Sequence, residues 1–192
     1  VRLIDDRLWL TLGVKWEDND FTGAEWQPSG RLLYKPADNH SLWGSVARAV
    51  RTPSIFERQG RLLMAVTPTP SGVAPIFFTG NENFASEIVV AYEMGYRWQL
   101  SPSLSADLAV FYNDYEDLYG LSPSMGTTGI SMNFINGTRG ASHGFEAAVD
   151  WKAASWLSMI FTYSYLDSDF TIDNEYEVIE LNGLFSPATP KH

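Results

Sequence analysis

Two groups of charged side chains have types and spacings that could bind an anionic ligand. Arg48 and Arg51 stand near the end of one predicted strand, and Glu87, Glu93 and Arg97 recur at i, i+6 and i+10 along another. Residues an even number apart share one face of a strand, because successive side chains leave a pleated backbone on opposite sides. The arginines could contact an anion or lie solvated at a strand end. Glu93 and Arg97 could each meet charges across neighbouring strands, as in a structural charge network.

Aromatic side chains in the irregular segments form a second kind of candidate site. Phe77, Phe78 and Tyr119 lie between predicted strands, and exposed aromatic rings supply binding area at low entropic cost. These three side chains could capture a hydrophobic or aromatic chelate, or they could pack within their loops. The acidic cluster at residues 167–175 lacks the glycine and the terminal glutamate of a known calcium loop. We therefore predict an acidic surface there and no metal site.

Several classes of function are not indicated. The chain has no cysteine, so neither a disulfide framework nor a thiolate metal site is expected. His40, His143 and His192 stand far apart, with no carboxylate at metal-ligand spacing, and no Ser-His-Asp order or phosphate-binding loop occurs. We predict no enzyme activity and no cofactor. The net charge of -10 argues against nucleic-acid binding, which usually needs a basic patch.

A long predicted hairpin, residues 87–119, carries Glu87, Glu93 and Arg97. Apolar residues alternate along both arms: Ile88, Val90, Tyr92, Met94, Tyr96 and Trp98 on the first, and Leu104, Ala106, Leu108, Val110 and Tyr112 on the second. A period of two predicts strands. Each arm is close to the length of about 9–11 residues that a tilted strand needs to cross a bilayer. One apolar face and one charged face indicate a strand between lipid and water.

The remaining connections alternate in length. Short turns are predicted near residues 36–40, 101–103 and 152–156, and long irregular segments at 52–85, 120–142 and from 167 onward, with a further strand beginning near residue 188. Short turns at one edge of a sheet and long loops at the other are typical of transmembrane β-barrels. The seven Trp and nine Tyr suit interfacial aromatic girdles. No run of about 18 apolar residues occurs, so no transmembrane helix is predicted.

An ordered set of motifs runs along nearly the whole chain. Residues 26–58 read WQPSGRLLYKPADNHSLWGSVARAVRTPSIFER, residues 86–115 contain Tyr-Glu-x-Gly-Tyr-Arg and Phe-Tyr-Asn-Asp-Tyr, and residues 144–166 contain Gly-Phe-Glu, Asp-Trp and Tyr-Ser-Tyr-Leu. In this order the motifs resemble the mid-to-late barrel of the TonB-dependent outer-membrane receptors.

The resemblance implies an all-β fold, an antiparallel transmembrane β-barrel with short periplasmic turns and long extracellular loops. Residues 1–192 would form a partial barrel domain of about seven or eight strands out of about 22, without the plug domain, the segment that engages TonB, or the closing strands. The chain begins with Val1, so we expect a fragment. Its candidate ligand or plug contacts are Arg48, Arg51, Phe77, Phe78, Glu93, Arg97 and Tyr119.

The function that this family implies is active import of a scarce nutrient, with a ferric siderophore as the expected substrate. The expected partners are outer-membrane lipid, the TonB complex through the missing N-terminal part, and a small-molecule ligand such as a metal chelate. The full-length protein would be a monomer in the outer membrane of a Gram-negative bacterium.

Two alternatives remain open at this point. A small passive or structural outer-membrane barrel of about eight strands would need a terminal strand that pairs with residues 8–16. A soluble, aromatic-rich β-sandwich acting as a binding module would need its apolar faces to pack against each other, and would stay soluble without detergent.

Overall fold

One sheet of ten strands dominates the computed structural model, which describes residues 1–70 and 72–172. The strands are β1 (Arg2–Ile4), β2 (Leu8–Asn19), β3 (Gly23–Ala37), β4 (His40–Arg51), β5 (Arg61–Thr69), β6 (Gly72–Thr79), β7 (Glu87–Ser101), β8 (Leu104–Gly126), β9 (Gly129–Ala154) and β10 (Leu157–Ile172), and the helix described is α1 (Ile55–Gln59). Within these residues no helix is both long enough and apolar enough to cross a membrane.

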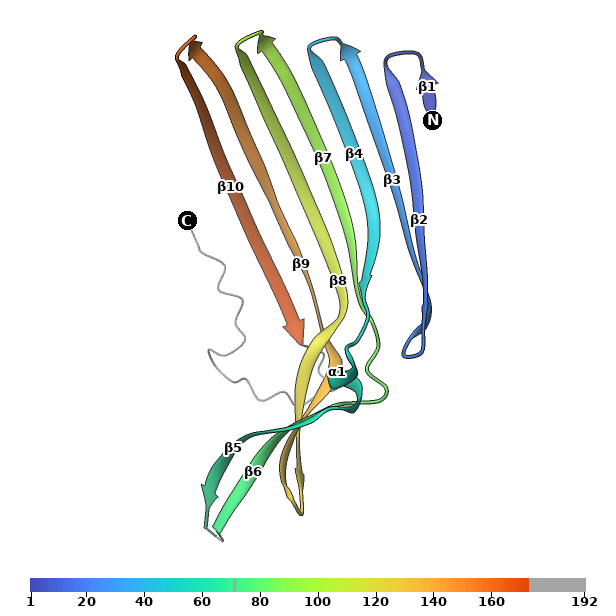
Figure 1. Ribbon diagram of the computed structural model, residues 1–192, viewed down its shortest axis with the longest axis vertical. Helices are drawn as coiled ribbons and strands as arrows, with labels where there is room; N and C mark the ends of the chain where they lie inside the picture. The colour runs from blue at the N-terminus through green and yellow to red at the C-terminus, as the bar shows by residue number, and fades with distance from the viewer. Residues whose placement is uncertain (71, 173–192) are drawn as a thin grey trace.

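Seven long strands stand side by side as a wall (Figure 1). In order they are β2, β3, β4, β7, β8, β9 and β10, and each pairs antiparallel with the next. Their lengths run from 12 to 26 residues, above the usual globular strand of about five or six. The predicted hairpin and the antiparallel sheet are therefore confirmed. The seven strands of the wall agree with the predicted seven or eight, and β1, β5 and β6 are additional strands that the pattern does not predict.

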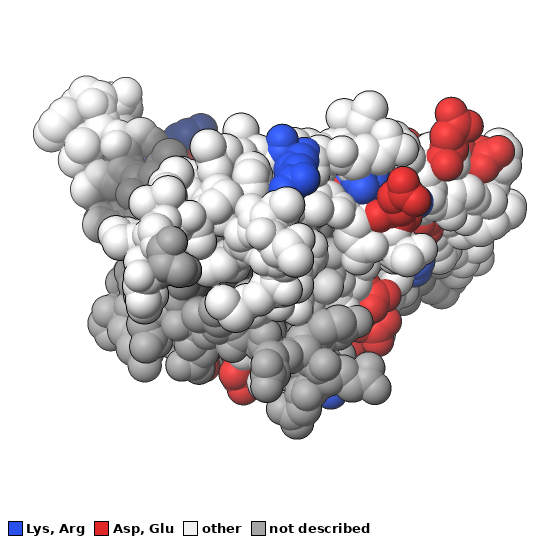
Figure 2. Space-filling model, turned by 90° about the horizontal axis from the view of Figure 1, so that it is seen from below, with Lys and Arg blue, Asp and Glu red and all other residues white. Residues whose placement is uncertain are grey.

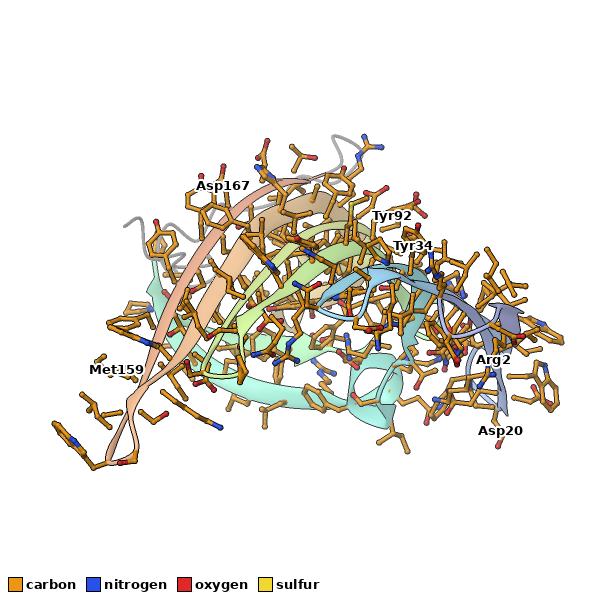
Figure 3. The ribbon with its side chains drawn as sticks, turned by 90° about the horizontal axis from the view of Figure 1, so that it is seen from above. Arg2, Asp20, Tyr34, Tyr92, Met159 and Asp167 are labelled. Atoms are coloured by element: carbon orange, nitrogen blue, oxygen red, sulfur yellow. The ribbon has the colours of Figure 1, made fainter. Side chains whose placement is uncertain are left out.

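The register of the wall gathers its apolar side chains on one face. Met94 of β7 stands opposite Val110 of β8, which in turn stands opposite Phe145 of β9. This face is exposed, with Met94 62% accessible and Leu12 of β2 74% accessible. Figure 3 shows the sheet curved, with the labelled Tyr34 and Tyr92 on its convex side. Such a broad exposed apolar face is typical of a surface that contacts lipid.

The opposite face is lined by polar, charged and small residues, and some aromatic rings lie flat across glycines of the next strand. A Cβ atom on Gly95 would come within 2.3 Å of the Trp43 ring, and one on Gly144 within 2.7 Å of the Phe111 ring. The Arg31 guanidinium lies over the Trp43 ring, 4.8 Å from its centroid. Glycine at these positions therefore lets a bulky ring lie along the wall.

We expect Gly95→Ala to destabilise the folded protein by about 1–3 kcal/mol, the usual cost of overpacking, because the new methyl group meets Trp43. Gly44→Ala is the matched control, since its Cβ would meet only an ordinary contact at 3.6 Å, the Glu93 carbonyl oxygen. The midpoint of thermal unfolding in detergent measures both variants. Equal midpoints would contradict the role assigned to Gly95.

The two ends of the wall differ. Three tight turns, at residues 38–39, 102–103 and 155–156, lie at the upper end in Figure 1. The lower end carries α1, the β5–β6 hairpin and the tip of the β8–β9 hairpin, together with the short turn at residues 20–22. There β6 joins the free edge of β9 as a parallel neighbour, from Ile76 opposite Ile130 to Thr79 opposite Asn133.

The prediction of irregular structure is wrong for much of two segments, residues 120–142 and residues 52–85. Residues 120–142 are strand almost throughout, because β8 continues to Gly126 and β9 begins at Gly129. The Ser, Gly and Asn residues there show no apolar alternation, yet the two backbones pair along the whole hairpin. Residues 52–85 contain α1, β5 and β6. In the third segment, β10 continues to Ile172, and the rest, with the strand expected near residue 188, lies outside the described residues.

Candidate ligand-facing site

A charged cluster marks the point where the wall meets the loop that follows β4. Helix α1 begins after Ser54, whose hydroxyl accepts a hydrogen bond from the Glu57 N–H at 3.3 Å, while the Glu57 carboxylate accepts one from the Ser54 N–H at 2.7 Å. This reciprocal arrangement is a capping box, and the sequence Ser-x-x-Glu is its signature. Residues 54–57 carry this signature, so the start of α1 is a feature that the sequence alone can indicate.

Arg51 links this helix start to the wall. Its guanidinium donates hydrogen bonds to Glu57, with Nη2 2.9 Å from Oε1, and to Glu87 on β7. Glu87 is buried, and its other carboxylate oxygen accepts the N–H of Tyr119 on β8 at 2.7 Å. The cluster of Arg51, Glu57 and Glu87, here called the junction cluster, therefore joins β4, β7, β8 and α1.

The Glu57 carboxyl is the titratable group of the junction cluster that lies in the loop. Burial acts to raise its pKa, but the hydrogen bonds from Arg51 and Ser54 outweigh burial and hold the pKa below the ordinary value of 4.5. A lowered pKa in the folded state means that the stabilisation is present above the unfolded pKa and is lost as pH falls through the folded value.

We therefore expect the α1 loop to stay protected at neutral pH and to become accessible to an acid protease below about pH 4.5. Limited proteolysis between pH 3 and pH 7 measures this change, with cleavage sites assigned by mass spectrometry. In Glu57→Gln, accessibility should vary less with pH. A wild-type profile that is flat across this range would contradict the prediction.

Arg58 holds the other side of α1. Its Nη1 donates to the carbonyl oxygen of Phe21 at 2.6 Å and to that of Phe84 at 3.1 Å, and its guanidinium lies 5.4 Å from the Phe21 ring centroid. Phe21 belongs to the β2–β3 turn, so one arginine fixes this turn, the helix and the segment that leads into β7. No pattern in the sequence indicates this role of Arg58, since its partners are backbone carbonyls far along the chain.

Four phenylalanines form a packed cluster next to α1, here called the Phe cluster. Phe134 of β9 is contacted by Phe56 of α1, Phe78 of β6 and Phe84, with ring centroids 5.9, 6.0 and 6.1 Å away. Phe84 is fully buried. The Asn81 side chain donates to the Phe134 carbonyl at 2.9 Å. The cluster fastens the β4–β7 loop onto the β8–β9 hairpin.

The structure separates the predicted site residues into distinct places. Arg51 lies in the junction cluster, Phe78 in the Phe cluster, and Tyr119 is exposed close to Glu87. Phe77 lies under Arg61, whose guanidinium is 4.1 Å from the ring centroid. The packing of Phe78 and Phe77 corresponds to the loop-packing alternative, whereas Tyr119 keeps an accessible ring.

The other predicted residues lie in the wall. Arg97 pairs with Asp107 across β7 and β8 at 3.4 Å, and Glu93 accepts a hydrogen bond from the Ser45 hydroxyl at 3.2 Å. Arg48 stands opposite Val90 on the apolar parity and donates to the Trp26 carbonyl. These residues therefore do not converge with the loop aromatics on one site.

Neither metal binding nor a histidine site emerges from the part of the chain that the structure describes. There, no group of three or more His, Cys, Asp or Glu side chains could hold a metal ion. His40 instead stacks between Tyr96 and Trp98, with ring centroids 5.9 and 5.7 Å away. Two members of the acidic cluster predicted at residues 167–175, Asp173 and Glu175, lie outside the described residues.

Comparisons with known proteins agree on the family that this chain resembles. The family model for the TonB-dependent receptor-like β-barrel matches residues 1–192. The chain is 27% identical to the probable TonB-dependent siderophore receptor PirA of Acinetobacter baumannii over 117 residues, 59% of this chain and 15% of that protein. It is 28% identical to the ferric enterobactin receptor of Pseudomonas aeruginosa over 131 residues, 66% of this chain and 17% of that protein.

A similar fold is present in solved structures. The crystal structure of the siderophore receptor PirA from Pseudomonas aeruginosa superposes with a TM-score of 0.73 at 21% identity, and the match covers 87% of this chain and 32% of that chain. At this identity the likeness shows the fold alone. The matched regions of the two curated relatives are less than a fifth of their length.

Proposed function

Because this chain belongs to the TonB-dependent receptor β-barrel family, we propose that it forms wall and extracellular loops of an outer-membrane transporter that imports a ferric siderophore. Energy would come through TonB and the parts of the protein outside this chain. The observation that carries the proposal is the wall itself, seven paired strands with one exposed apolar face and one polar face. Relatives named as siderophore receptors support the substrate class.

The family also supports an orientation for the wall. Short turns are periplasmic and long loops extracellular in such barrels, so the turns at residues 38–39, 102–103 and 155–156 would face the periplasm. The junction cluster, the Phe cluster and the β5–β6 hairpin would then lie on the extracellular side. In the view along the strands, α1 and the β5–β6 hairpin lie on the concave side of the sheet (Figure 3), where a ligand would enter the barrel.

The two alternatives fit less well. A soluble sandwich would bury the apolar faces of two sheets against each other, whereas the described strands form one sheet whose apolar face is exposed. A small closed barrel would need a terminal strand that pairs with residues 8–16, and among the described strands β2 pairs with β1 and β3. The relatives matched by sequence are receptors, not enzymes.

Uptake of radioactive iron tests the proposal. Cells that carry the full-length gene should accumulate iron from a ferric siderophore under iron limitation, and deletion of either this gene or tonB should abolish that uptake. Uptake that persists without TonB would favour a passive pore. Uptake unchanged by deletion of the gene, with a panel of siderophores and no second receptor present, would contradict import of this substrate class.

A further inference from the structure

The packed interior of the described residues lies outside the wall. Their buried large apolar side chains are Phe84, Leu121, Met132 and Ile135, and all four belong to the loop end. Here β8, β9, β6 and β5 follow one another at the loop end of the ten-stranded sheet, with β6 and β9 parallel, and this part of the sheet is here called the outer sheet. The four buried side chains give the loop end a packed core that the wall does not have.

Polar clamps hold the outer sheet in place beside the Phe cluster. The Asn136 side chain accepts the Ala85 N–H at 2.8 Å and donates to the Ala85 and Asp117 carbonyls at 3.1 and 2.7 Å. Asn133 donates to Ser122 and Ser124 across β8 and β9. A surface fixed in this way needs little ordering when a ligand binds, which favours affinity.

The outer sheet is formed by segments without charge. Residues 62–81 and 118–138 contain no Asp, Glu, Lys, Arg or His, although 19% of the chain is charged. Figure 2 looks at this end of the molecule and shows mostly uncharged side chains over the described surface at its centre, interrupted by basic side chains, with most acidic side chains at the right. The absence of charged side chains over such a length distinguishes this region from the polar face of the wall.

Apolar side chains are exposed on this neutral region, although it lies beyond the band that would face lipid. Six of them are more than half accessible: Leu62, Leu63, Met64, Val66, Val73 and Met125. Exposed apolar side chains gathered outside a membrane often mark a binding site. Of the arginines beside this region, Arg51 pairs with Glu57 and Glu87, whereas Arg61 lies over the Phe77 ring and keeps its charge just outside the uncharged segments.

We propose that the outer sheet binds an electroneutral, apolar-surfaced metal chelate. An apolar ligand surface gains about 25 cal/mol for each Å² removed from water. An anion placed on the uncharged segments would lose hydration and meet no charged side chain within them, which is costly. The chain's net charge of -10 adds long-range repulsion of anions. This inference rests on the proposed function and narrows its substrate class.

Two iron complexes of opposite character test the substrate class on the purified full-length protein in detergent. One is a ferric tris-hydroxamate, whose ligand charges balance those of Fe³⁺, and the other is a ferric tris-catecholate, a multiply charged anion. We expect the neutral complex to bind at least about tenfold more tightly by calorimetry. Equal or tighter binding of the catecholate overturns this inference and leaves siderophore import standing. Binding of neither complex counts against both.

Introducing either a negative or a positive charge at Val73 tests whether the outer sheet contacts the ligand. Val73→Asp and Val73→Lys should weaken binding of the neutral complex to a similar degree, about tenfold each, because either charge must be desolvated. Opposite effects of the two variants would mean that ligand charge meets this surface, and no effect would mean that another part of the protein covers it. Either result overturns the proposal. Ile55→Asp and Ile55→Lys are the controls, since Ile55 is exposed at the same end but outside the uncharged segments.

Discussion

Leu108→Arg is expected to prevent assembly of the full-length protein in the outer membrane. Leu108 lies in the middle of β8, between Tyr96 and Ala147 on the apolar face. A cationic side chain on the lipid face of a barrel costs about 2–4 kcal/mol near the bilayer midplane. Folded protein in purified outer membranes, detected by its heat-modifiable migration in gels, should fall to a small fraction of wild type.

Ala91→Arg is the matched control for that substitution. Ala91 lies in the middle of β7, on the opposite parity, between Ala47 and Asn113. Its side chain points toward the polar interior, so an arginine there stays hydrated and its effect on assembly should be mild. If both variants assembled equally well, or failed equally, the assignment of the two faces to lipid and lumen would be wrong.

The sequence predicts a strand well only where the two faces of that strand have different surroundings. In the proposed transporter, one face of β7 and β8 would meet hydrocarbon and the other water, so alternation is strong along these strands and predicts them. Beyond Tyr119 both faces would lie outside lipid, and alternation disappears although the strands continue. The sequence pattern therefore predicts a loop where the outer sheet lies, because nothing in that pattern indicates its backbone pairing or the Phe cluster.

The contacts of the site residues could likewise be predicted only in part from the sequence. Arg97 could be expected to meet a charge across the sheet, since neighbouring strands of known register place Asp107 opposite it. Glu87, one of the two partners of Arg51, stands in contrast on the far side of a 35-residue connection (residues 52–86), and only the fold brings the two together. The aromatic partner of Phe78 is Phe134 on β9, and no local pattern indicates this contact.

The wall and the outer sheet are stabilised by different means. In a membrane the wall would derive its stability from backbone pairing and from lipid around its apolar face, whereas the outer sheet has its own buried core of Phe84, Leu121, Met132 and Ile135. Strands β8 and β9 run through both parts, and the junction cluster adds an electrostatic connection between them. A change there should alter the loop end while leaving the wall assembled.

Arg51→Met is the substitution expected to show this separation. It leaves the Glu87 carboxylate, whose side chain is only 10% exposed, without its cationic partner. Loss of one partner of a buried pair costs about 3–5 kcal/mol, and we expect about 2–3 kcal/mol here because Arg51 is half exposed and solvent screens the pair. Hydrogen exchange should increase in α1 and in residues 84–87, while the protein still assembles in the membrane.

Adding Glu87→Gln to Arg51→Met shows whether the increased hydrogen exchange comes from the unpaired buried charge of Glu87 or from the lost contact with Arg51. The glutamine is neutral and its carbonyl oxygen can still accept the Tyr119 N–H, so the double variant should be more protected from exchange than Arg51→Met alone. Arg97→Met supplies the control, because the Arg97–Asp107 pair is exposed on both sides and such pairs contribute about 0–1 kcal/mol. If Arg97→Met changed exchange as much as Arg51→Met, burial of Glu87 would not be the reason for the effect.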